Sequence, residues 1–576
     1  MSLQPKHTWF YLSLLLANAL VFPIPASAAL PQTMQQAAQA IRQSLSSTQL
    51  TVDQGIYRYF SVADCEAVVA VIGNCLGNNP SSPYGMAFMP TRPGEAITPT
   101  MSLISEKLSV PSVDGHKLSA SWRMTAGRDA IILVGVTPPK HKYFSYINYV
   151  NTRENLNLVN PDSASLPLLN MILNNSNGDP SGTRRMVAAS IGNGLSMKSI
   201  KTSTPNNASG AVIIIMTPDR AYEEELRSKI AGIIAPFGLS PNIINSLPYP
   251  ADRLTLGLDG KADDFLFLAR AALPENEGEA NQFYQFDTSS NNTTRMTVLR
   301  AYDPDRKTTN LPNLYTALPE RKQGWNEDYL KEAQKTLTEG VISYFSNSQR
   351  LSLVRKTNPL GIYPGVPMLP FQGPLCIGSS PRLFGSYNCL GDNPHTTYVA
   401  SSSNFVMDGP NDSSKNIVVS VGIHHTAAKG VKGDKNGKSI YTSMSAYNKN
   451  QLKGLVSATS VDFANGTARH FVDWVPVPPV TQPILRKLAL DRIARLRAVQ
   501  DQLYVATFAR DCSKQFENSL QVNNIVCKSL DSTPTKEILG LNAPVNFFER
   551  AYMRPDGNIG PDYSEIAVPL FMQFKQ

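Results

Sequence analysis

The hydrophobic positions of the chain predict two opening helices, each followed by a series of strands. In the first stretch, residues three or four positions apart share one helical face: Met34, Ala38, Ile41 and Leu45. The second stretch has the same pattern: Tyr329, Ala333, Leu337 and Val341. We expect each helix to bury this face against the strands that follow it.

Strand signals dominate the sequence after each helix. Residues 143–149 alternate, so that the odd-numbered positions share one face of a strand, and residues 211–216 form a β-branched run typical of a buried strand. Residues 217–219 begin a predicted helix that continues to about Ile234. Because short strands outnumber helices, the sequence predicts an α+β fold.

Five sequence blocks occur twice, in the same order along the chain. The paired blocks are 55–61 with 340–346, 74–80 with 388–394, 131–136 with 417–423, Lys140/Tyr143/Ser145/Tyr149 with Lys438/Tyr441/Ser443/Tyr447, and 300–302 with 550–552. The second pair is identical at six of seven positions. This order predicts two divergent tandem copies of one strand-rich unit with a few helices each.

These blocks, together with the start of the chain, predict the domain boundaries. A signal peptide would occupy residues 1–28, a first repeat domain residues 29–310, a linker residues 311–326 and a second repeat domain residues 327–576. The spacing between blocks differs from one copy to the other, as expected when surface loops diverge faster than packed strands.

The first 28 residues have the three parts of a secretory signal. Lys6 precedes an apolar run over residues 9–22, and Ala26-Ser27-Ala28 is a small-residue cleavage site. An uncleaved membrane anchor is the alternative, but polar residues interrupt the run and two prolines end it early. We therefore expect a mature chain from about Ala29, secreted or periplasmic, with no transmembrane anchor after cleavage.

The six cysteines agree with export to an oxidising compartment. They lie in three close couples: Cys65 with Cys75, Cys376 with Cys389 and Cys512 with Cys527. Near-neighbour pairing predicts three structural disulfides, each worth about 3 kcal/mol for loops of this size. No C-x-x-C motif occurs, so the sequence predicts no metal site and identifies no cofactor.

Charge narrows the range of partners. The chain has 576 residues, of which 17% are charged, and a formal net charge of +8, which is too mild to predict a nucleic-acid partner. A predicted helix from Ile484 to about Gln502 concentrates basic residues after a proline-rich run. We favour a solvated helix face there, and an anionic glycan or lipid surface is the alternative.

Histidines of the second copy are the candidates for chemistry. His395 follows a repeated block, and His424 and His425 follow a predicted strand. With Asp392 and Tyr441 they would supply a general base or a polar site. We favour the simpler interpretation that these are solvated loop histidines, because neighbouring residues on a strand point to opposite faces.

The other repeated polar residues favour structural roles. The Tyr-Ser-Tyr spacing of the fourth block places its residues on one face of a strand, where tyrosines pack across it, and a nucleophile activated by the block's lysine is the alternative. For Arg300 and Arg550 we expect burial beside a carboxylate, and binding of an anion is the alternative. The chain has no nucleophile elbow, zinc-protease motif, P-loop or dinucleotide fingerprint.

Two of these segments also carry a resemblance. Residues 137–146, and Arg550-Ala551-Tyr552 with Gly560-Pro561 beyond them, resemble a group of secreted two-repeat proteins of unassigned function. The resemblance covers most of the mature chain and implies no activity, so it assigns no functional residue.

Two functions therefore remain open. The first is a ligand-binding or surface-associated protein whose two copies form a shared cleft for a small molecule or glycan. The second is an extracytoplasmic hydrolase with a histidine-containing site in the second copy. The sequence leaves the ligand and the oligomeric state undetermined.

Overall fold

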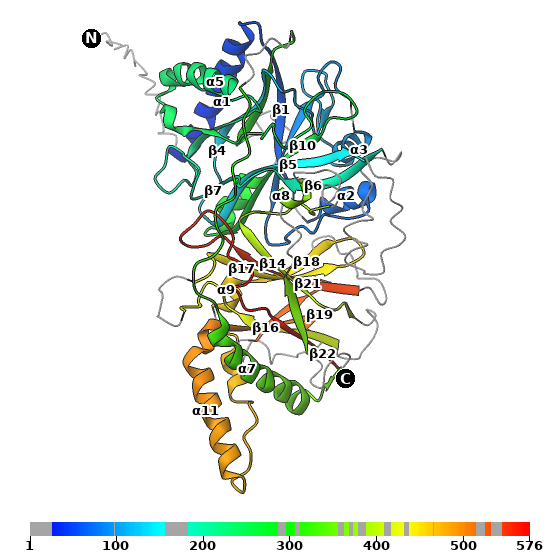
Figure 1. Cartoon of the computed structure of the whole chain (residues 1–576), viewed down its shortest axis with the longest axis vertical. Helices are drawn as coiled ribbons and strands as arrows, with labels where there is room; N and C mark the ends of the chain where they lie inside the picture. Colours follow the sequence, from blue (N-terminus) through cyan, green and yellow to red (C-terminus); the bar gives the residue numbers. More distant parts are fainter. Residues whose placement is uncertain are drawn as a thin grey trace, which may run out of the picture.

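The computed structural model describes most of the chain from Ala26 onward. The described residues are 26–576 except 61, 97, 156–182, 286–294, 306–310, 355–361, 368–372, 378–387, 408–415, 431–436, 465, 514–524 and 532–543. We call the residues up to 310 the first half and those from 327 the second half. The two halves form most of the upper and lower bodies of Figure 1, but residues 373–377 of the second half lie in the upper body, against residues 184–190.

The first half contains five helices longer than one turn and two short 3-10 helices among its described residues. The helices are α1 (Ala26–Ser46), α2 (Cys65–Ile72), α3 (Pro99–Lys107), α5 (Arg220–Ile234), η2 (Ala235–Phe237), η3 (Pro241–Ile243) and α6 (Glu277–Tyr284). Its strands are β1 (Thr51–Phe60), β2 (Tyr84–Pro90), β3 (Leu118–Ser119), β4 (Asp129–Val136), β5 (His141–Glu154), β6 (Arg184–Ser190), β7 (Leu195–Ser196), β8 (Ala211–Met216), β9 (Ile244–Ser246), β10 (Asp264–Pro274) and β11 (Met296–Tyr302).

The second half has the same mixture of elements. Its helices are η4 (Asp328–Leu330), α7 (Lys331–Ser343), the π-helix η5 (Tyr344–Ser348), α8 (Gly373–Ile377), α9 (Ser460–Phe463), α10 (Arg469–Val472), α11 (Pro483–Val499) and η6 (Gln500–Gln502). Its strands are β12 (Ser352–Leu353), β13 (Tyr363–Pro367), β14 (Thr396–Ser401), β15 (Phe405–Val406), β16 (Asn416–Ile423), β17 (Tyr441–Asn448), β18 (Lys453–Thr459), β19 (Leu503–Ala509), β20 (Val526–Ser529), β21 (Pro544–Tyr552) and β22 (Leu570–Lys575). The predicted α+β class is confirmed.

Each half is organised around one sheet. The first sheet runs β6-β5-β10-β2-β1-β11-β4-β8-β9 and the second β18-β17-β21-β14-β13-β22-β16-β19-β20. When the strands of each path are ranked by their position in the chain, both paths read 5-4-8-2-1-9-3-6-7. In both, the final pair is parallel and every other pair on the path is antiparallel.

Strand β1 of the first sheet and strand β13 of the second each change partner halfway along their length. Residues 51–55 of β1 pair with β11, whereas residues 56–60 pair with β2. In the second half β13 divides its pairing between β22 and β14 in the same way. The exchange in β1 requires Gly55, since a Cβ there would lie 2.1 Å from the carbonyl oxygen of Phe88. Such a strand turns a sheet onto itself.

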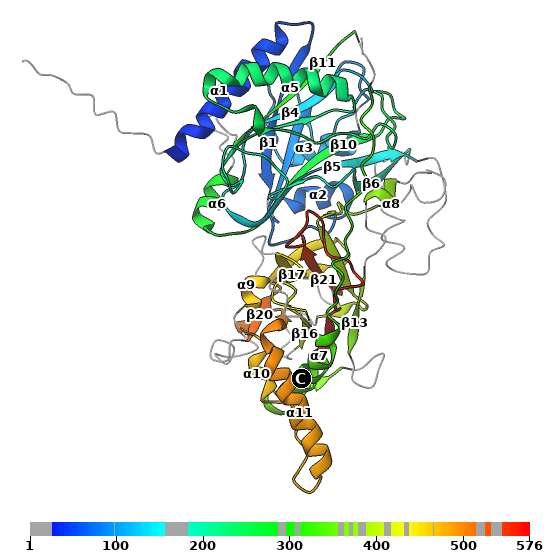
Figure 2. The same cartoon turned by 60° about the vertical axis from the view of Figure 1, so that its left-hand side comes forward.

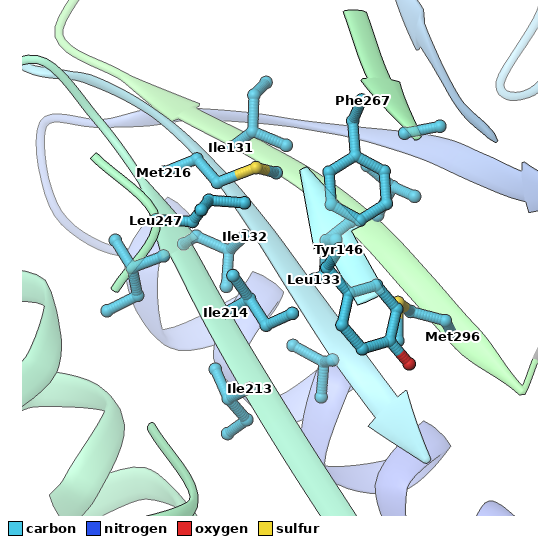
Figure 3. Close-up of a cluster of buried hydrophobic side chains, with 14 of the residues drawn as sticks. Ile131, Ile132, Leu133, Tyr146, Ile213, Ile214, Met216, Leu247, Phe267 and Met296 are labelled. Atoms are coloured by element: carbon cyan, nitrogen blue, oxygen red, sulfur yellow. The ribbon is translucent and has the colours of Figure 1, made fainter. Parts of the chain in front are cut away.

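The core of the first half lies between this folded sheet and two helices. Every residue of β4 and β8 is buried, which explains their continuous apolar sequence. Figure 3 shows Ile132 and Leu133 of β4 beside Ile214 of β8, with Tyr146 and Phe267 of the opposing strands facing them. The helices α1 and α5 pack along these strands (Figure 1) and bury the apolar face that the sequence predicted for α1.

A cluster of buried charges fixes the edge of this core. Arg300 on β11 has no exposed side-chain surface, and it contacts Glu95 at 2.8 Å and Asp129 at 3.2 Å. Arg92 adds a second cation, 2.6 Å from Asp129. Burial opposes ionisation, but the two arginines outweigh it and lower the pKa of Asp129. The predicted carboxylate partner of Arg300 is therefore present.

Two of the repeated blocks do not occupy matching positions. Residues 55–60 belong to β1, whereas 340–343 belong to α7. Gly340 is small for a different reason, because a Cβ there would lie 2.1 Å from the carbonyl oxygen of Phe471 on α10. Likewise Arg300 lies on β11, but the strand that takes the place of β21 in the first sheet is β10. The sequence analysis therefore matched these two pairs of blocks wrongly, because a few identical residues do not determine the position of a segment in a sheet.

The covalent framework follows the predicted near-neighbour pairing. Disulfides join Cys65 to Cys75, Cys376 to Cys389 and Cys512 to Cys527, with Cα–Cα distances of 5.6, 6.1 and 6.0 Å. Within the described part of the chain, no helix is long and apolar enough to cross a bilayer. Residues 1–25, most of the predicted signal peptide, lie outside the described residues.

We expect Leu133→Ala to lower the free energy of unfolding of the first half by about 2–5 kcal/mol, because it deletes buried methyl groups and leaves a cavity in a close-packed core. The control is Leu314→Ala, since the side chain of Leu314 is 65% exposed. Urea denaturation measures both variants. Equal effects of the two substitutions would contradict the packing described here.

Candidate ligand-binding site

Two equivalent loops cross between the halves and close the junction. The loop of residues 74–80 belongs to the first half. Its Cys75 and Gly77 amides, however, donate to the carbonyl oxygens of Gln451 and Leu452 in the second half, at 2.8 and 2.9 Å. The loop of residues 388–394 reaches in the opposite direction. Its Cys389 and Gly391 amides donate to the carbonyl oxygens of Val187 and Ala188 in the first half, at 2.7 and 2.8 Å.

The backbone conformations of the two crossing loops also agree. Leu76 and Leu390 have positive φ angles of 51° and 54°, and each is followed by a glycine with φ of 65° or 66°. Left-handed leucine is uncommon and costs free energy, so both loops are held in this shape by the contacts they make. The disulfides Cys65–Cys75 and Cys376–Cys389 tie the base of each loop to α2 and α8.

Each crossing loop accepts a hydrogen bond from a buried arginine of the other half. Arg270 on β10 donates to the Tyr149 hydroxyl and, at 2.6 Å, to the carbonyl oxygen of Gly391. Arg550 on β21 donates to the Tyr447 hydroxyl and, at 2.7 Å, to the carbonyl oxygen of Gly77. The arrangement is reciprocal, as in an interface between two identical subunits.

Tyrosine rings surround both guanidinium groups. The Cζ atom of Arg270 lies 5.3 Å from the ring centre of Tyr84 and 5.4 Å from that of Tyr149. Around Arg550 the corresponding distances are 5.5 Å to Tyr398 and 5.2 Å to Tyr447. The π faces stabilise the two cations where water is excluded.

Neither arginine forms an ion pair with any residue that the structure describes. Their residues are 3% and 4% exposed, and among the described residues no carboxylate oxygen lies within 4 Å of either guanidinium. This distinguishes them from Arg300, and it corrects the expectation that Arg550 pairs with a carboxylate. Two buried cations without a carboxylate in direct contact are costly unless neutral acceptors, aromatic faces or a bound anion compensate for them.

A cavity of about 120 Å³ opens beside the two arginines. Its wall is mostly apolar and comes mainly from α2, α3, β2 and β10 of the first half, with a smaller contribution from the second half. The apolar residues include Val68, Ile72, Met86, Met101, Ile104, Met186, Leu266, Leu268, Leu390 and Phe548. The site therefore combines an apolar body with cationic groups at the junction.

Asp392, one of the predicted site residues, also lines this cavity. Its carboxylate accepts from the amide and hydroxyl of Ser190, both at 2.7 Å, and from the Gly373 amide at 2.8 Å. Burial raises the pKa of Asp392, and these hydrogen bonds together with the positive charge of Arg270 oppose the shift. The carboxylate thus anchors its loop to β6 and forms no ion pair with Arg270, although its charge acts on that guanidinium.

The hydroxyls of Tyr441 and Tyr143 make hydrogen bonds across the junction between the halves, and neither activates a nucleophile. The Tyr143 hydroxyl donates to Ser145 and accepts from the side-chain amide of Asn393, both at 2.7 Å. The Tyr441 hydroxyl lies 2.6 Å from Ser81 Oγ of the first half. In the first half, the block's lysine, Lys140, is 60% exposed and paired with Glu275, so no Ser-Tyr-Lys cluster forms there.

His395 is buried at the same junction. Its Nδ1 atom lies 3.0 Å from the Tyr143 hydroxyl. Burial, together with the charges of Arg321 and Arg270, lowers the pKa of His395 to about 3, so the ring is neutral at physiological pH. It has no exposed surface, so the expectation of a solvated loop histidine was wrong here.

His425 lies inside the second half, between two glutamates. Its Nδ1 atom is 2.9 Å from both carboxylate oxygens of Glu327, and Nε2 is 3.3 Å from Glu549. Burial disfavours the imidazolium, but the two carboxylates outweigh it and raise the pKa of His425 to about 10. The charged ring ties the segment before α7 to β21.

His424 turns away from its neighbour. Its Nε2 atom lies 2.7 Å from the Thr426 hydroxyl, and its ring meets Phe463 edge to face. Burial and the charge of His425 lower the pKa of His424 to about 4. His424 and His425 are both buried, so the solvated interpretation was wrong for them as well.

The structure does not assemble the predicted histidine site. Among the described residues no contact joins His395 to His424 or His425, and no group of three histidine, cysteine or acidic side chains could hold a metal ion. A general base works best with a pKa near the operating pH. The pKa values of about 3, 4 and 10 lie far from neutrality.

Sequence reasoning missed Arg270 as a candidate site residue. Its block reads Arg-Ala-Ala, whereas that of Arg550 reads Arg-Ala-Tyr, so the search paired Arg550 with Arg300 instead. The sequence around Arg270 offered one signal. Arg270 is the single charged residue in the otherwise apolar run of residues 265–274. An isolated charge within a buried strand indicates a specific partner or ligand.

Comparisons with known proteins assign no function. No family model matches the chain, and no curated protein matches it. Among solved structures, it is similar to an uncharacterized protein from Burkholderia cenocepacia, at 10% identity and a TM-score of 0.32, covering 94% of this chain and 87% of the other. A second is the VPA0106 protein from Vibrio parahaemolyticus, at 8% identity and a TM-score of 0.29, covering 88% and 99%.

The raised pKa of His425 predicts a pH-dependent contribution to stability. In the unfolded chain the ring has a pKa of about 6.5, so the contribution is complete below that pH and is lost as the pH rises through about 10. The stability difference between the wild type and His425→Gln should shrink by about 1.4 kcal/mol per pH unit within this window.

Urea denaturation across the same pH range measures this difference. The control is the exposed residue His116, and His116→Gln should show no such slope. A difference that is constant with pH would show that His425 is neutral in the folded protein.

The crossing loops predict that the two halves stay together without the linker. A protease site introduced at residues 316–319, an extended and largely exposed part of the linker, should allow cleavage without dissociation. Size-exclusion chromatography of the cleaved, non-reduced protein should give one peak containing both fragments. Separate elution would mean that the contacts between the loops are too weak to join the halves.

Proposed function

We propose that the protein binds a small organic anion with an apolar body in the cavity between its halves. The observation that carries this proposal is the pair of buried guanidinium groups, Arg270 and Arg550, that line the cavity and form no ion pair with a described carboxylate. A carboxylate or similar anion would supply the missing counter-charge, through the charge-assisted hydrogen bonds that arginine makes well.

The size and lining of the cavity limit the ligand. At about 120 Å³ it is close to the roughly 150 Å³ engineered cavity that accommodates benzene. An aromatic acid or a short-chain fatty acid fits these limits, as does the end of a longer chain that leaves through an opening. A glycan fits poorly, because the apolar wall would leave its hydroxyl groups without partners.

The two halves are, in this proposal, divergent tandem copies of one unit. The identical strand order and the reciprocal crossing loops support it. Arg270 and Arg550 then occupy equivalent positions in the two copies, and the junction resembles the interface of a homodimer joined into one chain. A ligand site on such an axis receives one arginine from each copy.

The same proposal places the protein outside the cytoplasm. Three disulfides are consistent with an oxidising compartment, and the predicted signal peptide would direct the chain there. The alternative, a hydrolase with a histidine site in the second half, has no supporting geometry among the described residues. We therefore favour binding over hydrolysis.

The test measures the affinity for probes that differ only in charge. Isothermal titration of the disulfide-bonded protein with sodium benzoate and sodium hexanoate should show binding at least ten times tighter than with benzyl alcohol and hexanol. Arg270→Gln and Arg550→Gln should each weaken carboxylate binding about tenfold or more, a loss of at least about 1.4 kcal/mol. Ile104→Trp should abolish binding of all four probes by filling the cavity.

Arg220→Gln is the matched control, because that guanidinium is 57% exposed and lies on α5. It should leave every affinity unchanged. Equal binding of acids and alcohols would refute the role of the arginines, and failure of all four probes with the wild type would refute a site for compact anions of this class.

A further inference from the structure

Helix α11 projects from the second half as an isolated arm. Figures 1 and 2 both show it extending beyond the body, with its far end remote from the sheet. Only its C-terminal part packs inward, where Ile493 and Leu496 join the core beside α7. Since the chain enters β19 directly after the helix, the N-terminal turns around Pro483 form the tip.

Exposed apolar side chains gather at this tip. Ile484 is 76% exposed, and Leu485, Leu488 and Val480 are 53%, 55% and 75% exposed. Of the eleven exposed large hydrophobic residues in the described chain, six lie between positions 477 and 490. Scattered exposed leucines need no explanation, but a concentration of this kind marks an interaction surface.

The apolar residues face more than one side of the helix. At 100° per residue, Ile484 and Leu488 lie on one side, whereas Leu485 lies toward the neighbouring side and Leu490 on the far side. A surface of this kind is convex, so it has no groove for a partner segment. It suits entry into a soft apolar medium, tip first, better than docking against a flat protein surface.

Charge at the tip is uniformly positive. Arg486 and Lys487 are the only charged residues between positions 474 and 490. Arg486 donates to the carbonyl oxygen of Pro478 at 3.1 Å, and neither cation forms an ion pair with a described residue. Nearer the body, Arg492 and Arg497 are paired with Glu339 and Asp473. Arg495, also nearer the body, is exposed and forms no ion pair with a described residue either. At the tip itself, the two unpaired cations lie beside the exposed leucines.

We propose that the tip of α11, residues 480–488, docks the protein onto an anionic lipid bilayer. The leucines and isoleucine enter the boundary between headgroups and acyl chains, while Arg486 and Lys487 contact lipid phosphates. Apolar and cationic groups at one convex end match this surface. A second copy of the chain is a poorer occupant, because two such tips would repel one another.

The test is co-sedimentation of the full-length, disulfide-bonded protein with vesicles. Vesicles of phosphatidylcholine mixed with phosphatidylglycerol should bind the protein, whereas pure phosphatidylcholine should bind it at least tenfold more weakly. The triple variant Ile484→Ser, Leu485→Ser, Leu488→Ser and the double variant Arg486→Gln, Lys487→Gln should each lower the partition coefficient at least tenfold. High salt should weaken binding by the wild type.

Leu314→Ser and Val461→Ser are matched controls, because these side chains are 65% and 55% exposed but lie away from α11. They should bind like the wild type. Circular dichroism checks that the variants fold, as expected for substitutions at exposed positions.

Unaltered sedimentation of either tip variant would overturn the proposal. Binding to neutral and anionic vesicles alike would also refute the role assigned to the cations. If analytical ultracentrifugation shows a wild-type dimer that the triple variant lacks, the occupant is a second copy and the lipid proposal is wrong.

Discussion

The exchange of two loops across the junction is the constraint on which the rest of the structure depends. Each loop offers a glycine carbonyl to an arginine of the opposite half, and each is held in a left-handed turn at a leucine. The arginines in turn fix the tyrosines of the neighbouring strands. Without the exchange, both guanidinium groups would lose an acceptor in a space that excludes water, at a cost of several kcal/mol. The crossing loops and the two arginines also line the cavity, so the same contacts determine both its shape and its charge.

Two kinds of buried arginine serve different purposes in this protein. Arg300 lies between carboxylates and closes the edge of a core, where nothing remains for it to bind. Among the described residues, Arg270 and Arg550 contact neutral oxygens and aromatic faces and form no ion pair, which is the arrangement that our proposal of an anion site depends on. His425 belongs with Arg300, since its two glutamates use both ring nitrogens. Burial is common to all four groups, whereas a carboxylate in direct contact is present for Arg300 and His425 and not found for Arg270 and Arg550 among the described residues.

The sequence predicted what depends on local pattern and missed what depends on position in the sheet. Ile41 and Leu45 are buried as the helical spacing requires, and the disulfide pairs follow from separation along the chain. The equivalence of Arg270 and Arg550 is set by strand order, which three matching letters cannot reveal. The histidines were misplaced for a related reason. A loop after a strand is ordinarily exposed, but His395 is covered by the opposite half, which contacts it only once the whole chain has folded.

The strand β6 of the first half has a consequence for synthesis of the chain. Its Val187 and Ala188 carbonyls are satisfied by amides of Cys389 and Gly391, which the ribosome adds some two hundred residues later. Until then the first half presents an open sheet edge, the feature most prone to pairing with the wrong strand. The newly made first half is therefore the form of this protein that most needs a chaperone, and export before folding would postpone the hazard to the compartment where the disulfides form.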